Sequence, residues 1–337
     1  MQIAGLTILD RLVVTAHRAG IAPIFLVCET APTLMRAKAL GLRTTVVREI
    51  PTHDGVALLI TGSVILEVSD LERVIEARGQ LMARDGLPLP VKMIGCDPQP
   101  ISAFAVATEV RDEASACEAE GKLWASFNST ADGLLDRFVN RPLGRPLSKL
   151  LVRTGVSPNQ VSIISILIGV ASAWFFARGD FVLGALVLQL SAIIDCVDGE
   201  LARALLKQSR LGKWLDLGGD QVVHFSVFAA LGLGVARMDP ATPAFALGVS
   251  AAIGVLLSFA VVVRALRQPS AQRSPFLNRL LDATANRDFS VLLLILALID
   301  RMELFLWLAG IGVHVFWVAL LVLQLRPAMP AVSREPA

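Results

Sequence analysis

Four aspartates stand close together in an apolar part of the chain, where carboxylates are costly. Asp195 and Asp198 are three residues apart, and Asp216 and Asp220 are four apart. These spacings place both members of each pair on one face of a helix, and a short connection lets the two faces oppose each other. Crowded carboxylates repel one another unless cations neutralise them. Since oxygen ligands suit Mg²⁺, Mn²⁺ or Ca²⁺, the pattern predicts a site for two divalent cations, which would in turn bind phosphate oxygens.

Small residues accompany the aspartates. Gly199 and Gly212 let a ligand approach the backbone, and Ala202 keeps the adjoining helix face open. Arg203 is placed to contact a phosphate or to hold the carboxylates. The alternative is that these aspartates and Arg203 are simply solvated charges at helix ends. That explains one or two of them, but not four aspartates at paired helical spacing. We therefore expect a functional cluster, as is the default for acids inside membrane segments.

The elements that carry this cluster are apolar enough to cross a bilayer. Of 337 residues, 54% are hydrophobic and 18% are charged, against about 45–50% and about 25% in soluble domains. A bilayer-spanning helix needs about 20 largely apolar residues. Six spans are predicted, at 160–177, 181–203, 215–236, 242–264, 288–300 and 303–325.

Basic residues orient these spans. The loops on one side carry Arg178, Arg237 and Arg301, whereas fourteen Lys and Arg residues flank the spans on the other side. An excess of basic residues marks the cytoplasmic side. We expect a multi-pass protein of the cytoplasmic (inner) membrane, with the N-terminal half, the acidic cluster and the C-terminus in the cytoplasm.

Other classes of protein are disfavoured by composition. A net charge of +2 argues against a nucleic-acid partner. The four cysteines form no CxxC pair, so neither a zinc site nor a disulfide framework is indicated. The first residues form a poor signal peptide, because Asp10 and Arg11 interrupt their apolar stretch.

The first 130 residues have the pattern of a soluble α/β domain, in which short apolar runs are broken by charges. Alternating strands and helices predict a small doubly wound domain with a mostly parallel sheet. The predicted helices are 6–19 and 69–83, and the predicted strands are a buried strand at 21–29 and further strands at 42–48, 56–66, 91–96 and 101–110. The fold class is thus an α-helical integral membrane protein of six transmembrane helices preceded by a small cytoplasmic α/β domain.

A basic amphipathic segment joins the halves. Leu134, Leu135, Phe138 and Val139 share one helix face with arginines around them, which is typical of a helix lying in the membrane interface. The alternative is a plain linker. The predicted domains are 1–130 (α/β), 131–158 (interfacial helix or linker), 159–326 (six membrane helices) and 327–337 (tail).

The acidic segment resembles the signature of the CDP-alcohol phosphotransferases, also called CDP-alcohol phosphatidyltransferases. Its eight fixed positions are Asp195, Asp198, Gly199, Ala202, Arg203, Gly212, Asp216 and Asp220. The resemblance implies transfer of a phosphoalcohol from a CDP-alcohol to an acceptor hydroxyl with release of CMP, as in phospholipid or polyol-phosphodiester biosynthesis. It implies that the four aspartates bind the two cations, Mg²⁺ or Mn²⁺, and that Asp220 also acts as general base. It further implies a CDP site formed by Asp198, Gly199, Ala202, Arg203 and Gly212.

The N-terminal half resembles a sugar-nucleotidyltransferase domain in the segments 5–27 and 58–75. Ser63 occupies the turn where that fold normally presents a metal-binding aspartate, and the glycine-rich nucleotide loop would precede Gly5. We therefore expect a degenerate, inactive domain that serves stability, dimerisation or regulation. The arrangement is similar to fused enzymes that join an inositol-phosphate cytidylyltransferase to a di-inositol-phosphate phosphate synthase. A separate cytidylyltransferase would then supply the donor.

The substrates are less constrained by the sequence. The donor is expected to be CDP-diacylglycerol or a CDP-polyol, and the acceptor a polyol phosphate such as inositol phosphate. Arg264, Arg267 and Arg287 are candidates for holding the acceptor phosphate. The alternative is that these arginines only fix topology or contact anionic lipids.

Two other functions stay open at this point: a transporter that carries cations through the acidic cluster, and a pseudoenzyme scaffold. His224 and His314 are expected to be packed helix residues rather than metal ligands. Gly232 and Gly234 indicate either a close contact between helices or the seam of a homodimer.

Overall fold

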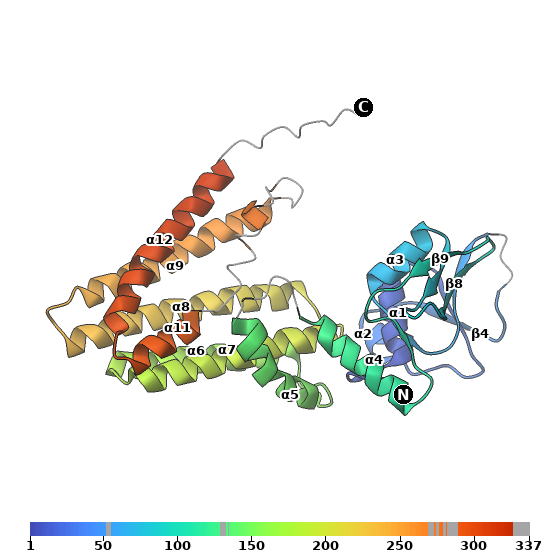
Figure 1. The fold of residues 1–337 in the computed structure, drawn as a ribbon, viewed down its shortest axis with the longest axis horizontal. Coiled ribbons are helices and arrows are strands. Elements are labelled where there is room, and N and C mark those ends of the chain that lie inside the picture. The colour runs from blue at the N-terminus through green and yellow to red at the C-terminus, as the bar shows by residue number, and fades with distance from the viewer. Residues whose placement is uncertain are drawn as a thin grey trace. The chain divides into compact units, whose positions relative to one another are not determined.

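The computed structural model describes residues 1–51, 55–128, 133, 135–268, 273, 276–278, 281 and 289–325 (Figure 1). The chain forms two compact units. The first consists of Met1–Ser129, Val152–Thr154 and Ala202–Lys207, and the second of Thr130–Leu151, Gly155–Leu201 and Gln208–Ala337.

The first unit is a small α/β structure. Its helices are α1 (Ile8–Arg18), α2 (Met35–Ala39), α3 (Val68–Glu76) and α4 (Glu113–Ser126). Its strands are β1 (Gln2–Ile3), β2 (Leu6–Thr7), β3 (Ile24–Val27), β4 (Thr44–Val47), β5 (Ala57–Ile60), β6 (Val64–Ile65), β7 (Gly79–Met82), β8 (Pro88–Ile94), β9 (Gln99–Ser102) and β10 (Thr108–Glu109). The largest sheet has four strands in the order β5-β8-β7-β9, and the other described strands pair two by two.

The prediction of a mostly parallel, doubly wound sheet is wrong. β8 runs antiparallel to both β5 and β7, and only the β7–β9 and β3–β4 pairs are parallel among the described strands. The reason is a tight hairpin at Asp85-Gly86, in which Gly86 adopts φ +83° and so connects β7 directly to β8. Gly62, with φ +80°, likewise separates β5 from β6, where one strand was expected. The strand expected at 101–110 is also two, β9 and β10.

One buried apolar cluster of this unit contains Val13 and Val14 of α1, Leu26 of β3 and Ala37 of α2. β3 is not the buried strand that was predicted, because Phe25 and Val27 are 44% and 50% exposed. The side chain of Asp10 is buried and accepts hydrogen bonds from the backbone N–H groups of Arg36 (2.6 Å) and Ala37 (2.7 Å) at the start of α2.

Beside Asp10, the guanidinium of Arg11 is also buried. It donates to the carbonyl oxygens of Ile3 and Ala204, the second of which belongs to the same unit. Burial lowers the pKa of Arg11 to about 10.

The second unit is helical. A π-helical turn, η1 (Asp136–Asn140), leads into α5 (Arg141–Leu151), and the later helices are α6 (Pro158–Arg178), α7 (Phe181–Ala204), α8 (Arg210–Met238), α9 (Ala244–Arg267), α11 (Phe289–Leu298) and α12 (Met302–Leu325). α8 packs against α6 and α9, and α9 packs against α12 (Figure 1). Five described helices are long and apolar enough to cross a membrane, namely α6, α7, α8, α9 and α12.

These five helices match five of the predicted spans. The segment expected at 288–300 contains α11, whose ten described residues are too few to span a bilayer by themselves, so a sixth span stays a prediction. α8 begins at Arg210, five residues before the expected 215, because the Ser209 side chain caps it by accepting a hydrogen bond from the Gly212 N–H (2.9 Å). Asp216 therefore lies within the second turn of the helix.

Glycines allow α8 to approach its neighbours closely. A Cβ atom on Gly234 would overlap the carbonyl oxygen of Phe176 in α6. A Cβ atom on Gly232 would lie 2.7 Å from the Cα of Gly248 in α9. Both glycines thus make close contacts between helices of one chain, which is the first of the two roles expected for them.

Candidate metal centre

Three of the four aspartates come together between α7 and α8. Asp195, Asp198 and Asp216 each offer one carboxylate oxygen, and these oxygens all lie within 4.8 Å of one another. Asp198 is buried, Asp195 is half-buried and Asp216 is exposed. The group therefore has one open side, through which a ligand can reach carboxylates that are otherwise enclosed.

Asp220 follows Asp216 by one helical turn on α8 and is 7% exposed. The helix is tightly packed at this level, because a Cβ atom on the preceding Gly219 would overlap Cδ1 of Ile166 in α6. Asp220 thus occupies the same face as Asp216 but a deeper position.

Serines of α6 support the aspartates, although the sequence pattern alone does not single them out. Ser165 Oγ hydrogen-bonds to Oδ1 of Asp195 at 3.1 Å. Ser162 Oγ makes a short hydrogen bond to Oδ2 of Asp198. The hydroxyl of Ser191 in α7 in turn donates to the Ser165 carbonyl oxygen (2.7 Å). Such contacts fix the orientation of ligand side chains. Two serines three residues apart, just after Pro158-Asn159, are the signal that could have indicated them.

The first turns of two helices meet beside the carboxylates. A Cβ atom on Gly212, in the first turn of α8, would lie 3.2 Å from Oδ1 of Asn159, in the first turn of α6. Helix N-termini carry unpaired N–H groups and a partial positive charge, which attract anions. Because it has no side chain, Gly212 allows the N-termini of α6 and α8 to approach each other.

The other described residues that were predicted for the site lie on α7 and α9. Gly199 is half-buried on α7. Ala202 and Arg203 fall within the first unit, where the Arg203 guanidinium lies over the ring of Phe127, 5.9 Å from its centroid. Arg264 and Arg267 are on the last turn of α9, and Arg287 lies outside the described residues.

Both histidines are packed as expected. The ring of His224 lies against Phe289, with centroids 4.8 Å apart, and His314 accepts a hydrogen bond from Nε1 of Trp317 and contacts Ser250. His224 also borders an apolar cavity of about 390 Å³ between α8, α9, α11 and α12. Residues of α8 that line this cavity are Leu217, Gln221, His224 and Phe228.

Comparison with known proteins places this site in a family. A model of the CDP-alcohol phosphatidyltransferase family matches residues 155–325. The bifunctional IPC transferase and DIPP synthase of Thermococcus kodakarensis is 39% identical over 106 residues, which cover 32% of this chain and 24% of that protein. The archaetidylinositol phosphate synthase of Pyrococcus horikoshii is 35% identical over 28% of this chain and 50% of its own length.

A solved structure is also similar. The phosphatidylinositol phosphate synthase of Mycobacterium tuberculosis, crystallised with CDP-DAG bound, is 22% identical with a TM-score of 0.42, over 58% of this chain and 100% of that one. The chain spans about a quarter of the length of the bifunctional relative from Thermococcus kodakarensis and of its counterpart in Aquifex aeolicus. Because the family model covers more than half of the chain, including all eight signature positions, this protein belongs to the CDP-alcohol phosphatidyltransferase family.

Proposed function

We propose that this protein transfers a phosphoalcohol group from a CDP-alcohol to an acceptor hydroxyl and releases CMP. The observation that carries this proposal is the cluster of Asp195, Asp198 and Asp216, whose oxygens lie within 4.8 Å of one another in a chain of this family. The new bond joins the acceptor oxygen to the β-phosphorus, the bond from that phosphorus to CMP breaks, and its electron pair leaves with CMP.

The residues present fit divalent cations. An all-carboxylate donor set suits Mg²⁺ or Mn²⁺, and the exposed Asp216 leaves room for a phosphate ligand. Asp195, Asp198, Asp216 and Asp220 would hold two ions, which, when bound, neutralise the donor diphosphate and the charge that develops on CMP.

Asp220 takes the proton of the attacking hydroxyl in this proposal. It lies one helical turn beyond Asp216, on the same face of α8. A carboxylate within reach of the attacking hydroxyl can act as its general base. In this proposal Asp195, Asp198 and Asp216 bind metal, and Asp220 both binds metal and takes the proton.

We assign the nucleotide part of the donor to the signature residues Asp198, Gly199, Ala202, Arg203 and Gly212. Where Gly212 meets Asn159, two helix N-termini offer N–H groups to the diphosphate. Arg203 adds a guanidinium, which suits phosphate oxygens.

A lipid donor such as CDP-diacylglycerol is favoured over a CDP-polyol by the apolar cavity. Its lining residues Leu217 and Gln221 directly follow Asp216 and Asp220 on α8. Relatives named phosphatidylinositol phosphate synthase and archaetidylinositol phosphate synthase support inositol phosphate as the acceptor. Arg264, Arg267 and Arg287 would hold its phosphate.

The proposed function also includes the membrane topology that the sequence predicts. Six spans place the N-terminal unit, the site and the C-terminus on the cytoplasmic side of the inner membrane. α5 fits a helix in the interface, because Phe138 just before it and Leu143 and Leu150 within it are 59–68% exposed beside basic residues.

We further propose that residues 1–130 form a degenerate nucleotidyltransferase-like domain, since Ser63 takes the place of the expected aspartate. The full-length protein given CTP, Mg²⁺ and inositol phosphate is expected to form no CDP-inositol, as followed by chromatography of the nucleotides. A CTP-dependent product would overturn this assignment.

The activity itself is tested by CMP release from the purified protein in detergent with Mg²⁺ or Mn²⁺. We expect CMP only when a CDP-alcohol and an acceptor are both supplied, with inositol phosphate preferred to inositol. CMP release that ignores the acceptor would contradict the transfer reaction. Metal binding without any CDP-alcohol binding would favour the cation transporter instead.

A further inference from the structure

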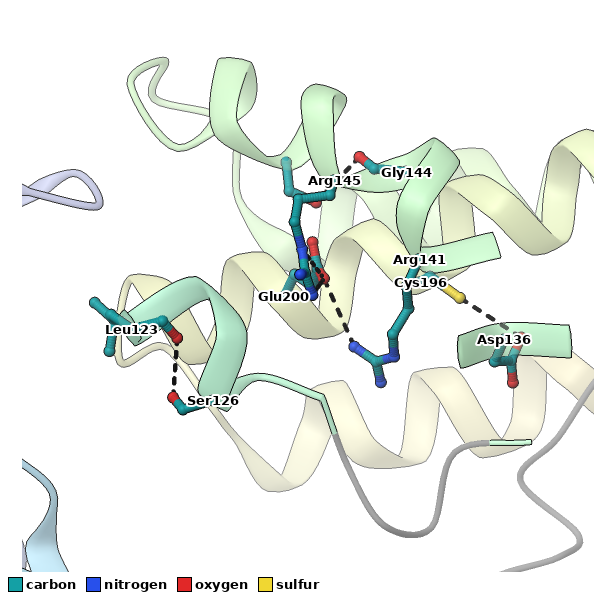
Figure 2. Close-up of polar contacts among 9 residues, drawn as sticks. Leu123, Ser126, Asp136, Arg141, Gly144, Arg145, Cys196 and Glu200 are labelled. Atoms are coloured by element: carbon teal, nitrogen blue, oxygen red, sulfur yellow. Dashed lines mark hydrogen bonds and ion pairs between the residues drawn. The ribbon is translucent and has the colours of Figure 1, made fainter. Parts of the chain in front are cut away.

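α7 has a second polar face, turned away from the aspartates. Glu200 follows Asp198 by two residues, which on a helix places it about 200° around the axis. It is 1% exposed, and its Oε1 accepts hydrogen bonds from Nη2 (2.9 Å) and Nε (3.2 Å) of Arg145 in α5. Arg141, one turn earlier on α5, places Nη1 3.7 Å from the same oxygen (Figure 2). A buried carboxylate is thus enclosed by two arginines.

The same face of α7 makes contacts along half of the helix, from Gln189 to Glu200. A Cβ atom on Gly144 of α5 would lie 3.0 Å from the Ile193 carbonyl oxygen and 3.2 Å from Cγ2 of Val197, so the two helices are in direct contact. Further back, Gln189 donates to Oδ1 of Asn140 (2.5 Å). The residues Gln189, Ile193, Val197 and Glu200 follow one another at steps of four, four and three, which is one helix stripe.

The far end of this stripe is tied to a third helix. Ser290 of α11 donates to Oε1 of Gln189 at 2.9 Å. Asn140, at the end of η1, donates in turn to Oδ1 of Asp136 (2.7 Å). Polar contacts therefore fix α7 at both ends of the stripe, while its opposite face presents Asp195 and Asp198 to Asp216.

We propose that Glu200 is a positioning residue of the metal centre. Paired with Arg145 and Arg141, it sets the rotation of α7 about its axis and thereby the direction of the Asp195 and Asp198 carboxylates. The proposal rests on the function proposed above, because it concerns the affinity of that centre for divalent cations. The eight signature positions do not include this residue.

The test compares Mn²⁺ binding by the full-length wild-type protein and Glu200→Gln in detergent. Free Mn²⁺ is measured by its electron paramagnetic resonance signal, and thermal unfolding is measured without metal. We expect Glu200→Gln to weaken Mn²⁺ binding about ten-fold, the lower end of what residues supporting metal ligands contribute. The matched control is Asp180→Asn, which breaks an exposed pair with Arg178 (3.7 Å) and should leave Mn²⁺ affinity unchanged.

A role in stability alone would lower the unfolding temperature and leave Mn²⁺ affinity unchanged, which would overturn the proposal. Arg145→Met should weaken Mn²⁺ binding as Glu200→Gln does, whereas Arg145→Lys, which keeps the positive charge, should retain much of the wild-type Mn²⁺ affinity. The double variant Glu200→Gln, Arg145→Met should lose less Mn²⁺ affinity than the product of the two single fold-losses, because it removes the charges of both partners together. A loss equal to that product would count against the pairing. If Glu200→Gln fails to fold, the two Arg145 variants decide. A wild-type protein that binds no Mn²⁺ would instead refute the proposed metal centre.

Discussion

We expect Asp220→Asn to abolish measurable turnover while the protein still binds its CDP-alcohol donor. The amide cannot take the proton of the attacking hydroxyl, and a positioned general base contributes about 10²–10⁴-fold to a rate. Asn has nearly the same shape, so the packing around Gly219 and Ile166 is preserved. We expect kcat for CMP release to fall by at least about 100-fold, with donor binding, measured by calorimetry in detergent, reduced far less.

The matched control is Asp180→Asn, an exposed position between α6 and α7 that takes no part in the cluster. It should show wild-type kcat and KM. Turnover close to wild type in Asp220→Asn would remove the base assignment, and would leave Asp220 at most a weak metal ligand. A loss of donor binding as large as the loss of kcat would assign it to metal binding alone.

Local spacing predicts the two pairs of aspartates. Positions three and four apart share a helix face whatever the surrounding fold, so Asp195 pairs with Asp198, and Asp216 with Asp220, from the sequence alone. The short connection between the two helices then predicts that the pairs meet, and the structure brings Asp195, Asp198 and Asp216 together. The five long helices are predictable for the same reason, because hydropathy over about 20 residues is a local property.

Contacts between distant segments are not predictable in this way. Ser162 and Ser165 reach the aspartates because α6 packs against α8 and lies beside α7, and the sequence does not state which faces meet. Glu200 looks in the sequence like one more charge at a helix end, and only its enclosure by two arginines of α5 distinguishes it.

The N-terminal sheet shows a different failure. The sequence pattern does not reveal the strand at Gly79–Met82, so the hairpin at Asp85-Gly86 that joins it to the next strand is also missed. The segment is then interpreted as part of a regular alternation of helices and strands, which wrongly predicts a parallel sheet. The dipeptide Asp-Gly is a stronger indication than this alternation, because a hairpin turn makes the next strand run antiparallel to the preceding one.

Asp216→Asn should remove both metal binding and donor binding. Asp216 is the only one of the three clustered carboxylates on α8 and the only exposed one, so it closes the site across the two helices on the side where phosphate would enter. We expect Mn²⁺ affinity to fall on the order of 100-fold or more, since a ligand should matter at least as much as the groups that support it. CMP release should disappear with it.

Metal removal from the wild-type protein should have the same effect reversibly. With EDTA, CMP release should cease, and excess Mg²⁺ or Mn²⁺ should restore it, with Ca²⁺ compared as the larger ion. In Asp216→Asn, raising the metal concentration should recover only part of the rate of CMP release, because the neutral amide replaces the carboxylate through which α8 would bind the ions. Full activity in EDTA, or wild-type Mn²⁺ affinity in Asp216→Asn, would show that the clustered carboxylates do not serve the reaction. The loss of donor binding expected in both cases would show that the diphosphate is held chiefly through the ions, and that the helix N-termini at Asn159 and Gly212 do not hold it by themselves.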